Sequence, residues 1–152
     1  YEFVKPLEDK LNKIIAFTDT HEEDSVELLS YPAHCLADSD ECKVVDELLD
    51  IKNLEIIQKN STNGFFAIDI NTLNDIDNVV VVGDCTDICI YQFVVTLKAY
   101  FNEKNINKNI VVPMNLVDTY DIPFVHPGDL LNVVFLNSMV QNGVKLIKKF
   151  SL

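Results

Sequence analysis

Apolar and polar positions follow two different periods along this chain, and the change of period predicts its elements. The segment 79–82 is a run of four valines, the pattern of a strand buried on both faces in a parallel sheet. After Cys89 the apolar residues recur at helical spacing, which predicts an amphipathic helix up to about Glu103. Thr86 and Asp87 are suitable capping residues for the start of that helix.

The same two periods alternate over the rest of the chain. Strands are predicted at 14–18, 54–58, 79–82, 110–113 and 144–150, and helices at 3–12, 42–50, 90–103 and 126–141. The inward residues of the last helix are expected to be Leu130, Leu131, Val134, Phe135 and Met139. This rhythm predicts an α/β fold with a parallel sheet and right-handed crossovers. No repeat or linker interrupts it, so we expect a single domain over residues 1–152.

Composition narrows the possible partners. A chain of 152 residues that is 48% hydrophobic can form one domain with a full core. The net charge of -12 argues against nucleic acid and anionic membranes as partners, and no membrane span or signal peptide is visible. All twelve basic residues are lysines, which favours a small, neutral or weakly charged substrate over a phosphorylated one. Four cysteines without close pairing indicate free thiols in a reducing cytoplasm.

Polar side chains follow three of the predicted strands. Asp19 and His21 follow the first strand, Lys59 ends the second, and Cys89 follows the valine run. Ligands of parallel α/β sheets gather at the carboxyl ends of the strands. A carboxylate, an imidazole, an ammonium and a thiol at three such ends therefore predict an active site.

Cys89 and Lys59 each allow two interpretations. The first turn of a helix favours a thiolate, which makes Cys89 a candidate nucleophile; the alternative is a buried structural cysteine. Lys59 at the end of an apolar strand is a candidate cation for that thiolate and for the charge on an attacked carbonyl. The alternative is a lysine whose ammonium reaches the surface from the strand end.

A second candidate feature is a metal site. Asp19, His21 and His34 are a carboxylate and two imidazoles, a set that suits zinc or another first-row divalent ion, and Glu27 is a candidate fourth ligand. The alternative is that both histidines are ordinary loop residues beside an acidic run. We interpret Cys35 and Cys42 as packing residues and His126 as structural.

Three separated motifs resemble one enzyme family. The segment 83–89, Gly-Asp-Cys-Thr-Asp-Ile-Cys, resembles the G-x-x-T-D-x-C turn of the isochorismatase-like cysteine hydrolases. Within that superfamily, 19–21 and 31–35 resemble the D-x-H and W-P-x-H-C elements of nicotinamidases (pyrazinamidases). Lys59 with the downstream Asn63-Gly64-Phe65 resembles the lysine and the small-residue-Phe segment of that family. The resemblance runs from about Ile14 to the C-terminus and implies a Rossmann-like, three-layer sandwich around a mostly parallel sheet.

The resemblance also implies roles for individual residues. Cys89 is the nucleophile that attacks a carboxamide, and Lys59 holds its thiolate. The backbone N–H groups of Cys85 and Cys89 form the oxyanion hole, the first of them presented by a cis peptide between Asp84 and Cys85. These roles imply hydrolysis of nicotinamide to nicotinic acid and ammonia through a thioester.

The substrate would be held by the metal and by an aromatic side chain. The resemblance implies one divalent ion, zinc or else manganese or iron, on Asp19, His21 and His34, with Glu27 where some relatives have a further ligand. Phe65 is then a substrate-binding residue. Members of the family often form oligomers, so a homo-oligomer is compatible with the resemblance.

Two departures from the family pattern leave alternatives open. The triad aspartate of the family lies in a D-x-Q-x-D-F segment at the end of its first strand, and the 152 residues contain no such segment. We therefore expect that an N-terminal strand of the natural protein is missing from this sequence. Thr62 stands where relatives often have an aromatic residue. The alternatives to a nicotinamidase are another small-amide hydrolase of this superfamily and a catalytically inactive metal-binding domain.

Overall fold

The computed structural model describes residues 1–150. Its contacts divide the chain into two compact units, residues 1–68 and residues 69–152. Each unit contains its own strands, and every strand pair among the described residues is parallel. The prediction of a single domain stays a prediction.

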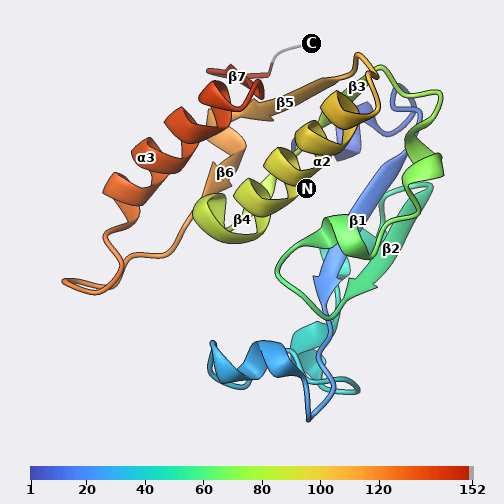
Figure 1. Cartoon of the computed structure of the whole chain (residues 1–152). Coiled ribbons are helices and arrows are strands. Elements are labelled where there is room, and N and C mark those ends of the chain that lie inside the picture. The colour runs from blue at the N-terminus through green and yellow to red at the C-terminus, as the bar shows by residue number, and fades with distance from the viewer. Residues whose placement is uncertain (151–152) are drawn as a thin grey trace. The chain divides into compact units, whose positions relative to one another are not determined.

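The first unit is built on one pair of strands. β1 (Ile14–Asp19) lies parallel to β2 (Leu54–Lys59), in a register that places Ile14 opposite Leu54 and Asp19 opposite Lys59 (Figure 1). The remaining elements are short: the 3₁₀ turns Lys5–Leu7, Val26–Leu29, Asp40–Cys42 and Gly64–Phe66, and the helix α1 (Asp46–Leu49). The parallel pairing brings the carboxyl ends of both strands, with their polar residues, to the same edge.

The second unit contains two small sheets and two longer helices. The first sheet has the strand order β3 (Asn78–Val80), β5 (Asn109–Pro113), β7 (Lys145–Ile147). The second sheet pairs β4 (Gly83–Asp84) with β6 (Val117–Asp118). The helices are α2 (Tyr91–Glu103) and α3 (Gly128–Gln141), which contact each other (Figure 1), and the short turns are Ile70–Leu73, Thr86–Ile90 and Met114–Leu116.

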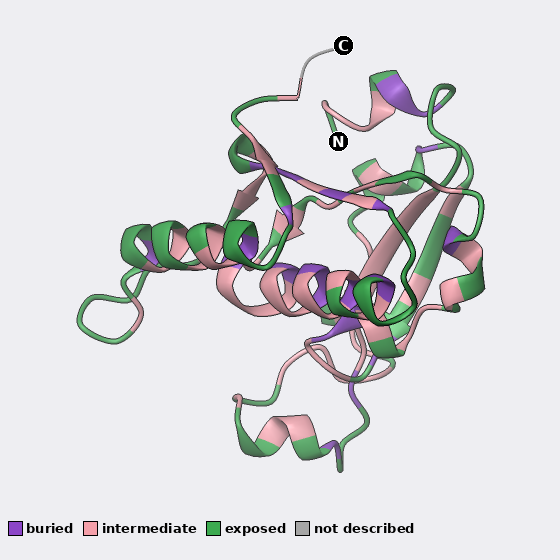
Figure 2. Ribbon diagram, turned by 45° about the horizontal axis from the view of Figure 1, so that its top comes forward, coloured by how far each residue is buried: buried purple, intermediate pink, exposed green. Residues whose placement is uncertain are grey.

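The apolar core of the second unit lies along one side of α2. Phe93, Val94, Leu97 and Phe101 are buried at helical spacing, which is the period expected from the sequence (Figure 2). The core is completed by Ile110, Val112, Met139 and Val144 from the strands and from α3. The helix that follows Cys89 is therefore anchored along its length by apolar packing.

The predicted strands are largely confirmed. β1, β2 and β5 match the predictions within one residue at each end. The valine run is a strand only to Val80, although Val81 N–H still donates to the Val111 carbonyl at 2.9 Å. β7 occupies only the middle of the predicted segment 144–150.

Two predicted helices are mostly wrong. Residues 3–12 contain only the 3₁₀ turn at 5–7; Leu7 is buried but Leu11 is exposed, so no continuous apolar face stabilises a longer helix. Residues 42–50 contain only the four-residue α1, since the backbone is extended at Lys43 and at the β-branched Val45. In both segments apolar residues recur at helical spacing, but the backbone does not form the predicted helix.

The last predicted helix is confirmed, with a different inward face. α3 buries Met139 and half-buries Leu131 and Phe135, whereas Leu130 and Val134 are exposed. The residues of α3 are apolar nearly all round, so their spacing does not identify one face. No helix among residues 1–150 is long and apolar enough to cross a membrane.

Candidate active site

The turn that carries Cys89 lies between the short strand β4 and the helix α2. β4 ends at Asp84, the peptide bond from Asp84 to Cys85 is cis, and Thr86–Ile90 form a π-helical turn that leads directly into α2. The N–H groups of Ile88 and Ile90 both donate to the Cys85 carbonyl, at 3.2 and 3.1 Å. Cys89 therefore lies at the amino end of a helix, where the dipole favours a thiolate over a thiol.

The turn is also held by α3. Tyr91, the first residue of α2, stacks edge-to-face on Phe135 with ring centroids 4.8 Å apart. Its hydroxyl lies 3.0 Å from the hydroxyl of Ser138, also on α3. The amino end of α2 is thus fixed by an aromatic contact and a hydrogen bond.

The capping expected of Thr86 and Asp87 is wrong. The N-cap residue of the turn is Cys85, and no side chain caps it. The Thr86 side chain is buried, and the Asp87 carboxylate accepts from the Thr119 hydroxyl at 2.5 Å and lies 2.9 Å from His126 Nε2. Both partners come from the loop between β6 and α3, which the sequence pattern did not connect to Asp87.

The cysteines differ in their surroundings. No cysteine among the described residues forms a disulfide. Burial raises the pKa of the Cys85 thiol, and the charges of Asp84 and Asp87 act in the same direction. Burial likewise raises the pKa of the Cys35 thiol. Cys85 and Cys35 are therefore poor nucleophiles at neutral pH, because the thiolate is the reactive form.

Lys59 is a buried cation at the carboxyl end of β2. Its side chain is 6% exposed, and its ammonium donates to the Asp19 carboxylate and to the Ser61 carbonyl. The parallel register accounts for the first contact, because Asp19 and Lys59 are paired across β1 and β2. The ammonium does not extend to the surface, so the interpretation as a surface-reaching lysine is wrong.

His21 lies next to this pair. Backbone hydrogen bonds join His21 to the loop at Cys35 and Ala37, and these bonds bring the His34 segment alongside. The imidazole of His21 is 1% exposed; its Nδ1 lies 3.2 Å from Asn60 Oδ1 and its Nε2 lies 4.0 Å from Asp19 Oδ1. Nε2 is buried and has no hydrogen-bond partner among the described residues.

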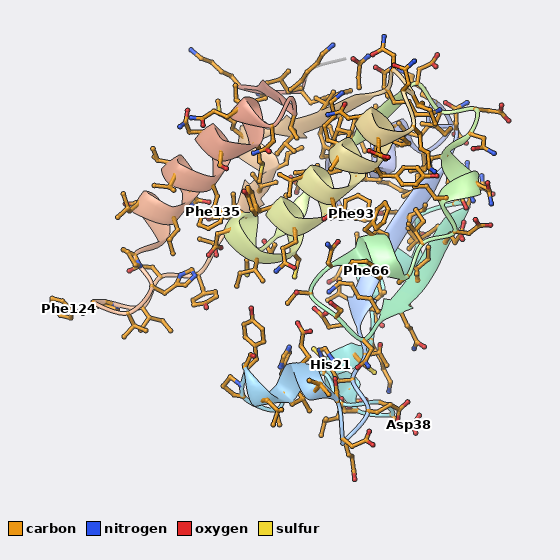
Figure 3. All side chains as sticks on the ribbon, in the orientation of Figure 1. His21, Asp38, Phe66, Phe93, Phe124 and Phe135 are labelled. Atoms are coloured by element: carbon orange, nitrogen blue, oxygen red, sulfur yellow. The ribbon has the colours of Figure 1, made fainter. Side chains whose placement is uncertain are left out.

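His34 completes the group of imidazoles in the first unit. Its ring centroid lies 4.8 Å from that of His21. His34 Nδ1 donates to the Pro32 carbonyl at 2.7 Å, so Nε2 carries the lone pair of the neutral ring. The His21 side chain, on which His34 packs, is labelled in Figure 3.

The fourth candidate ligand is engaged elsewhere. Glu27 Oε1 accepts a hydrogen bond from the Thr62 N–H at 3.0 Å and so ties two loops of the first unit together. Within residues 1–150, no three His, Cys, Asp or Glu side chains are grouped closely enough to hold a metal ion. Asp19 and His34 each lie near His21, but the three side chains do not form one cluster.

Phe65 lies in the turn that follows Lys59. Its N–H donates to Asn63 Oδ1 at 3.1 Å. Its ring lies edge-to-face to that of Phe66, with ring centroids 5.7 Å apart. Gly64 is required there, since a Cβ at this position would lie 3.1 Å from the Phe17 ring. Close packing on β1 therefore fixes where this turn places the Phe65 ring.

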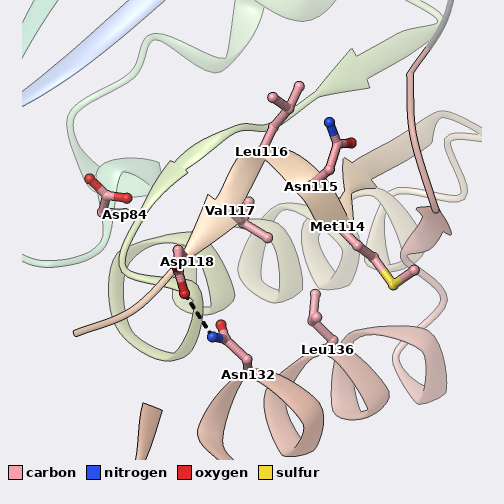
Figure 4. Close-up of a pocket in the computed structure, with 8 residues that line it drawn as sticks. All are labelled: Asp84, Met114, Asn115, Leu116, Val117, Asp118, Asn132 and Leu136. Carbon is pink, nitrogen blue, oxygen red and sulfur yellow. Dashed lines mark hydrogen bonds between the residues drawn. The ribbon is translucent and has the colours of Figure 1, made fainter. Parts of the chain in front are cut away.

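The second unit also contains a pocket of about 430 Å³ next to β4 (Figure 4). Its polar lining includes Asp84, Asp118 and Asn132, and Asn132 donates to Asp118 at 2.8 Å. This bond and the Thr119 N–H lower the pKa of the Asp118 carboxyl. The pocket lining includes Asp84, at the end of β4, but not Cys89.

Comparison with known proteins agrees with this arrangement of strands and helices. Nicotinamidase 1 of Arabidopsis thaliana is 27% identical over 168 aligned residues, which cover 94% of this chain and 68% of the relative. The pyrazinamidase/nicotinamidase of Streptococcus mutans superposes with a TM-score of 0.77 at 18% identity, covering 96% of this chain and 81% of that one. The N-carbamoylsarcosine amidase of Thermoplasma acidophilum gives 0.75 at 17% identity, covering 98% and 79%. No protein-family model matches the chain.

The chain has the fold of the isochorismatase-like hydrolases. The resemblance of its sequence to that superfamily, and within it to nicotinamidases, is confirmed by these relatives. These relatives are named as two nicotinamidases and one amidase.

Some residues of the site were not found from the sequence. Asn60 holds the His21 ring, and Thr119 and His126 hold Asp87. Asn60 follows Lys59 directly, and a polar side chain at the end of a predicted strand could have marked it as a site residue. The pairing of Asp87 with residues more than thirty positions away had no such signal, because it depends on the course of a loop.

Proposed function

We propose that this protein is a cysteine amidohydrolase that converts nicotinamide to nicotinic acid and ammonia. The observation that carries the proposal is the place of Cys89, in a turn at the amino end of α2 directly after a short strand. The resemblance to nicotinamidases supplies the substrate.

The reaction has two covalent steps. The Cys89 thiolate attacks the carboxamide carbon, and the negative charge that forms on the oxygen is stabilised by the N–H groups of Cys85 and Cys89. The carbon–nitrogen bond then breaks, and the amine takes up a proton and leaves as ammonia. Water attacks the resulting thioester, releases the carboxylic acid and restores the thiol.

Lys59 provides the positive charge for this chemistry. Its ammonium is buried and held by Asp19 and by the Ser61 carbonyl, so its position is set before substrate binds. The family resemblance assigns it to the Cys89 thiolate. A buried ammonium stabilises both a thiolate and the developing oxyanion far better than an exposed one.

The donor types around His21 suit a divalent ion, and binding one would require Asp19 and His34 to move closer to His21 than they lie in the structure. A buried Nε2 without a hydrogen-bond partner, on a ring whose Nδ1 faces the Asn60 oxygen, is the arrangement of a metal-binding histidine with a supporting partner. Asp19 and His34 are the nearest further donors. A bound ion would supply a coordination position for the ring nitrogen of a pyridine carboxamide. Glu27 would need to release Thr62 in order to join this set.

The proposal is tested by substitution of Cys89 in the full-length protein. We expect Cys89→Ala to reduce ammonia release from nicotinamide by about 10⁴-fold or more, because no other thiol replaces the nucleophile. Cys42→Ala is the matched control, since Cys42 lies on a 3₁₀ turn of the other unit and its thiol donates to Ser39. Activity that survives in Cys89→Ala would overturn the proposal.

The substrate is tested separately. Nicotinamide, pyrazinamide and N-carbamoylsarcosine should be compared by kcat/KM, because a solved structure with this fold is an amidase of the third compound. A preference for N-carbamoylsarcosine would keep the cysteine mechanism and change the substrate. Absence of turnover with all three, in a protein whose Cys89 reacts normally with iodoacetamide, would indicate a binding domain without amidase activity.

A further inference from the structure

A second group of titratable side chains is centred on Asp87, which belongs to the same turn, Thr86–Ile90, as Cys89. Asp87, two residues before Cys89, is 7% exposed at its side chain, and His126 is 14% exposed. His126 Nε2 lies 2.9 Å from Asp87 Oδ2, and the Thr119 hydroxyl donates to Asp87 Oδ1 at 2.5 Å. The ring of Tyr120 stacks on the imidazole, with centroids 3.8 Å apart and planes 18° from parallel.

The contacts of His126 determine its protonation. Nδ1 lies 2.8 Å from the Tyr120 carbonyl, which only accepts hydrogen bonds, so Nδ1 carries a hydrogen. A neutral ring would then place the lone pair of Nε2 against a carboxylate oxygen 2.9 Å away, two acceptors facing each other. A hydrogen must therefore lie between Nε2 and the carboxylate oxygen for the two atoms to approach this closely.

The loop between β6 and α3 is shaped to present this imidazole. Ile122 and His126 exchange two backbone hydrogen bonds, of 2.9 and 2.8 Å, which close the loop below the ring. Gly128 lets α3 begin immediately beside this loop, since a Cβ there would lie 2.9 Å from the Tyr120 carbonyl oxygen. The Gly128 N–H donates to Asp121 at 2.8 Å. The position of His126 is thus fixed by its backbone as well as by its ring.

We propose that His126 is held as an imidazolium cation against Asp87 and is a positioning residue for the turn that carries Cys85 and Cys89. The inference rests on the proposed function in one respect, the assignment of Cys89 as the reactive residue. His126 makes no contact with substrate in this scheme. It acts through Asp87, whose backbone belongs to the same π-helical turn as Cys89.

The charges around the pair explain why a cation is useful there. The titratable groups that face His126 are Asp87 and Tyr120, and the charges of Asp84 and Asp87 both act on the neighbouring Cys85. A carboxylate two residues from a catalytic sulfur disfavours the thiolate unless its charge is balanced. The imidazolium balances that charge, and with the Thr119 hydroxyl it holds both oxygens of Asp87 in place.

The protonation is tested by NMR of protein labelled with ¹⁵N at its three histidines. The signal of His126 is assigned by its loss in His126→Gln. We expect both ring nitrogens of His126 to carry a hydrogen at neutral pH. A neutral ring with an unprotonated Nε2 would overturn the inference, whether or not the protein hydrolyses nicotinamide.

The positioning role is tested by the rate at which iodoacetamide alkylates Cys89, measured by mass spectrometry. We expect His126→Ala to slow alkylation about 10-fold and His126→Gln, whose neutral amide donates to Asp87 without balancing its charge, to restore part of the rate. Phe124→Ala is the control in the same loop, because Phe124 is fully exposed and lies at the tip of the loop (Figure 3). In the amidase assay the same loss should appear in kcat and leave KM unchanged.

Several outcomes separate the two proposals. An unchanged alkylation rate in a folded His126→Ala protein would overturn the positioning role and leave the amidase proposal intact. Slower alkylation with rescue by His126→Gln, in a protein that hydrolyses no amide, would support the positioning role and overturn the amidase. If His126→Ala does not fold, Thr119→Val removes the other donor to Asp87, and an unchanged rate there overturns the role in the same way.

Discussion

Two buried charged residues show how much of the site chemistry depends on single contacts. Lys59 and Asp87 are both less than a tenth exposed; Lys59 is bound to a side chain and a backbone carbonyl, and Asp87 to two side chains. A buried charge without such partners would cost several kcal/mol, so these contacts are required for folding as well as for function. Substitution of either partner is therefore expected to leave an uncompensated charge.

The reactivity of the four thiols is predicted to differ at this scale. Burial raises the pKa of Cys85 and of Cys35, so both remain protonated at neutral pH, whereas Cys89 lies at the amino end of α2. We expect iodoacetamide to label Cys89 at least about 10-fold faster than Cys85 and Cys35 at pH 7, because the thiolate is the reactive form. Peptide mapping after brief treatment measures the ratio. Equal labelling of all sites in the folded protein would contradict this expectation, and labelling in urea gives the unstructured reference.

Metal binding is a second prediction for single residues. We expect the protein to retain about one divalent ion after incubation with zinc or manganese, and His21→Ala or His34→Ala to lose it. Asn60→Ala, which removes the partner of His21 Nδ1, should weaken binding about 10- to 100-fold. Elemental analysis after gel filtration gives the metal content, with His126→Gln as the histidine control in the other unit. A protein that retains no metal under these conditions would count against the site.

At the scale of elements, a buried lysine connects a loop to the start of β5. Lys108 is 9% exposed, and its ammonium donates to three backbone carbonyls, those of Leu73, Asn74 and Ile76, at 2.7–2.8 Å. The ring of Phe101 lies 6.0 Å from the same nitrogen. The Lys108 ammonium thus binds carbonyls at the end of the Ile70–Leu73 turn and in the segment between that turn and β3.

Lys108→Met should therefore destabilise the second unit. The substitution keeps the apolar stem and removes the ammonium donor from all three carbonyls, of which, within residues 1–150, only that of Leu73 keeps a backbone donor, the Ile76 N–H. We expect a loss of about 2–3 kcal/mol in the free energy of unfolding. Lys104→Met, at an exposed position near the end of α2, should change stability by no more than about 0.5 kcal/mol. Urea unfolding of the two variants measures the difference. Equal midpoints would show that the three carbonyls find other partners.

At the scale of the whole molecule, the chain combines a net charge of -12 with carboxylates that are individually stabilised. Acid relieves the general repulsion between like charges, but it also protonates the carboxylates that the fold binds. Glu8 is one of these, with the Lys52 N–H 2.8 Å away and the Lys5 ammonium 3.2 Å away. The hydrogen bond from Lys52 lowers the pKa of the Glu8 carboxyl, and that from Lys5 adds to the effect.

The contribution of Glu8 to stability should consequently depend on pH. A carboxyl whose pKa is lower in the folded state stabilises the protein above its unfolded pKa of about 4.3 and loses that effect as the pH falls through the folded value. Glu8→Gln should therefore reduce stability at pH 7 and have progressively less effect below about pH 4. Thermal unfolding at several pH values tests this, with Glu2→Gln at an exposed position as the control. A difference between variant and unmodified protein that is constant with pH would contradict the argument.

Much of the fold was predictable from local patterns. Strands such as β1 and β5 and the helix α2 follow from apolar runs and from helical spacing, because burial of those side chains is what stabilises the elements. The polar residues at the strand ends were predictable for the same reason, since parallel strands end at one edge. The helices at 3–12 and 42–50 were not, because burial does not follow their apolar spacing: Leu11 and Leu49 are exposed.

The sequence by itself determined which residue types stand at the ends of the strands, and with them the class of chemistry. Only the tertiary structure decided the partners of those residues: Lys59 with Asp19, His21 with Asn60, and Asp87 with His126. The reason is physical. Periodicity reports which side chains are removed from water, whereas a hydrogen bond between residues forty positions apart depends on the path of the loops that bring them within 3 Å.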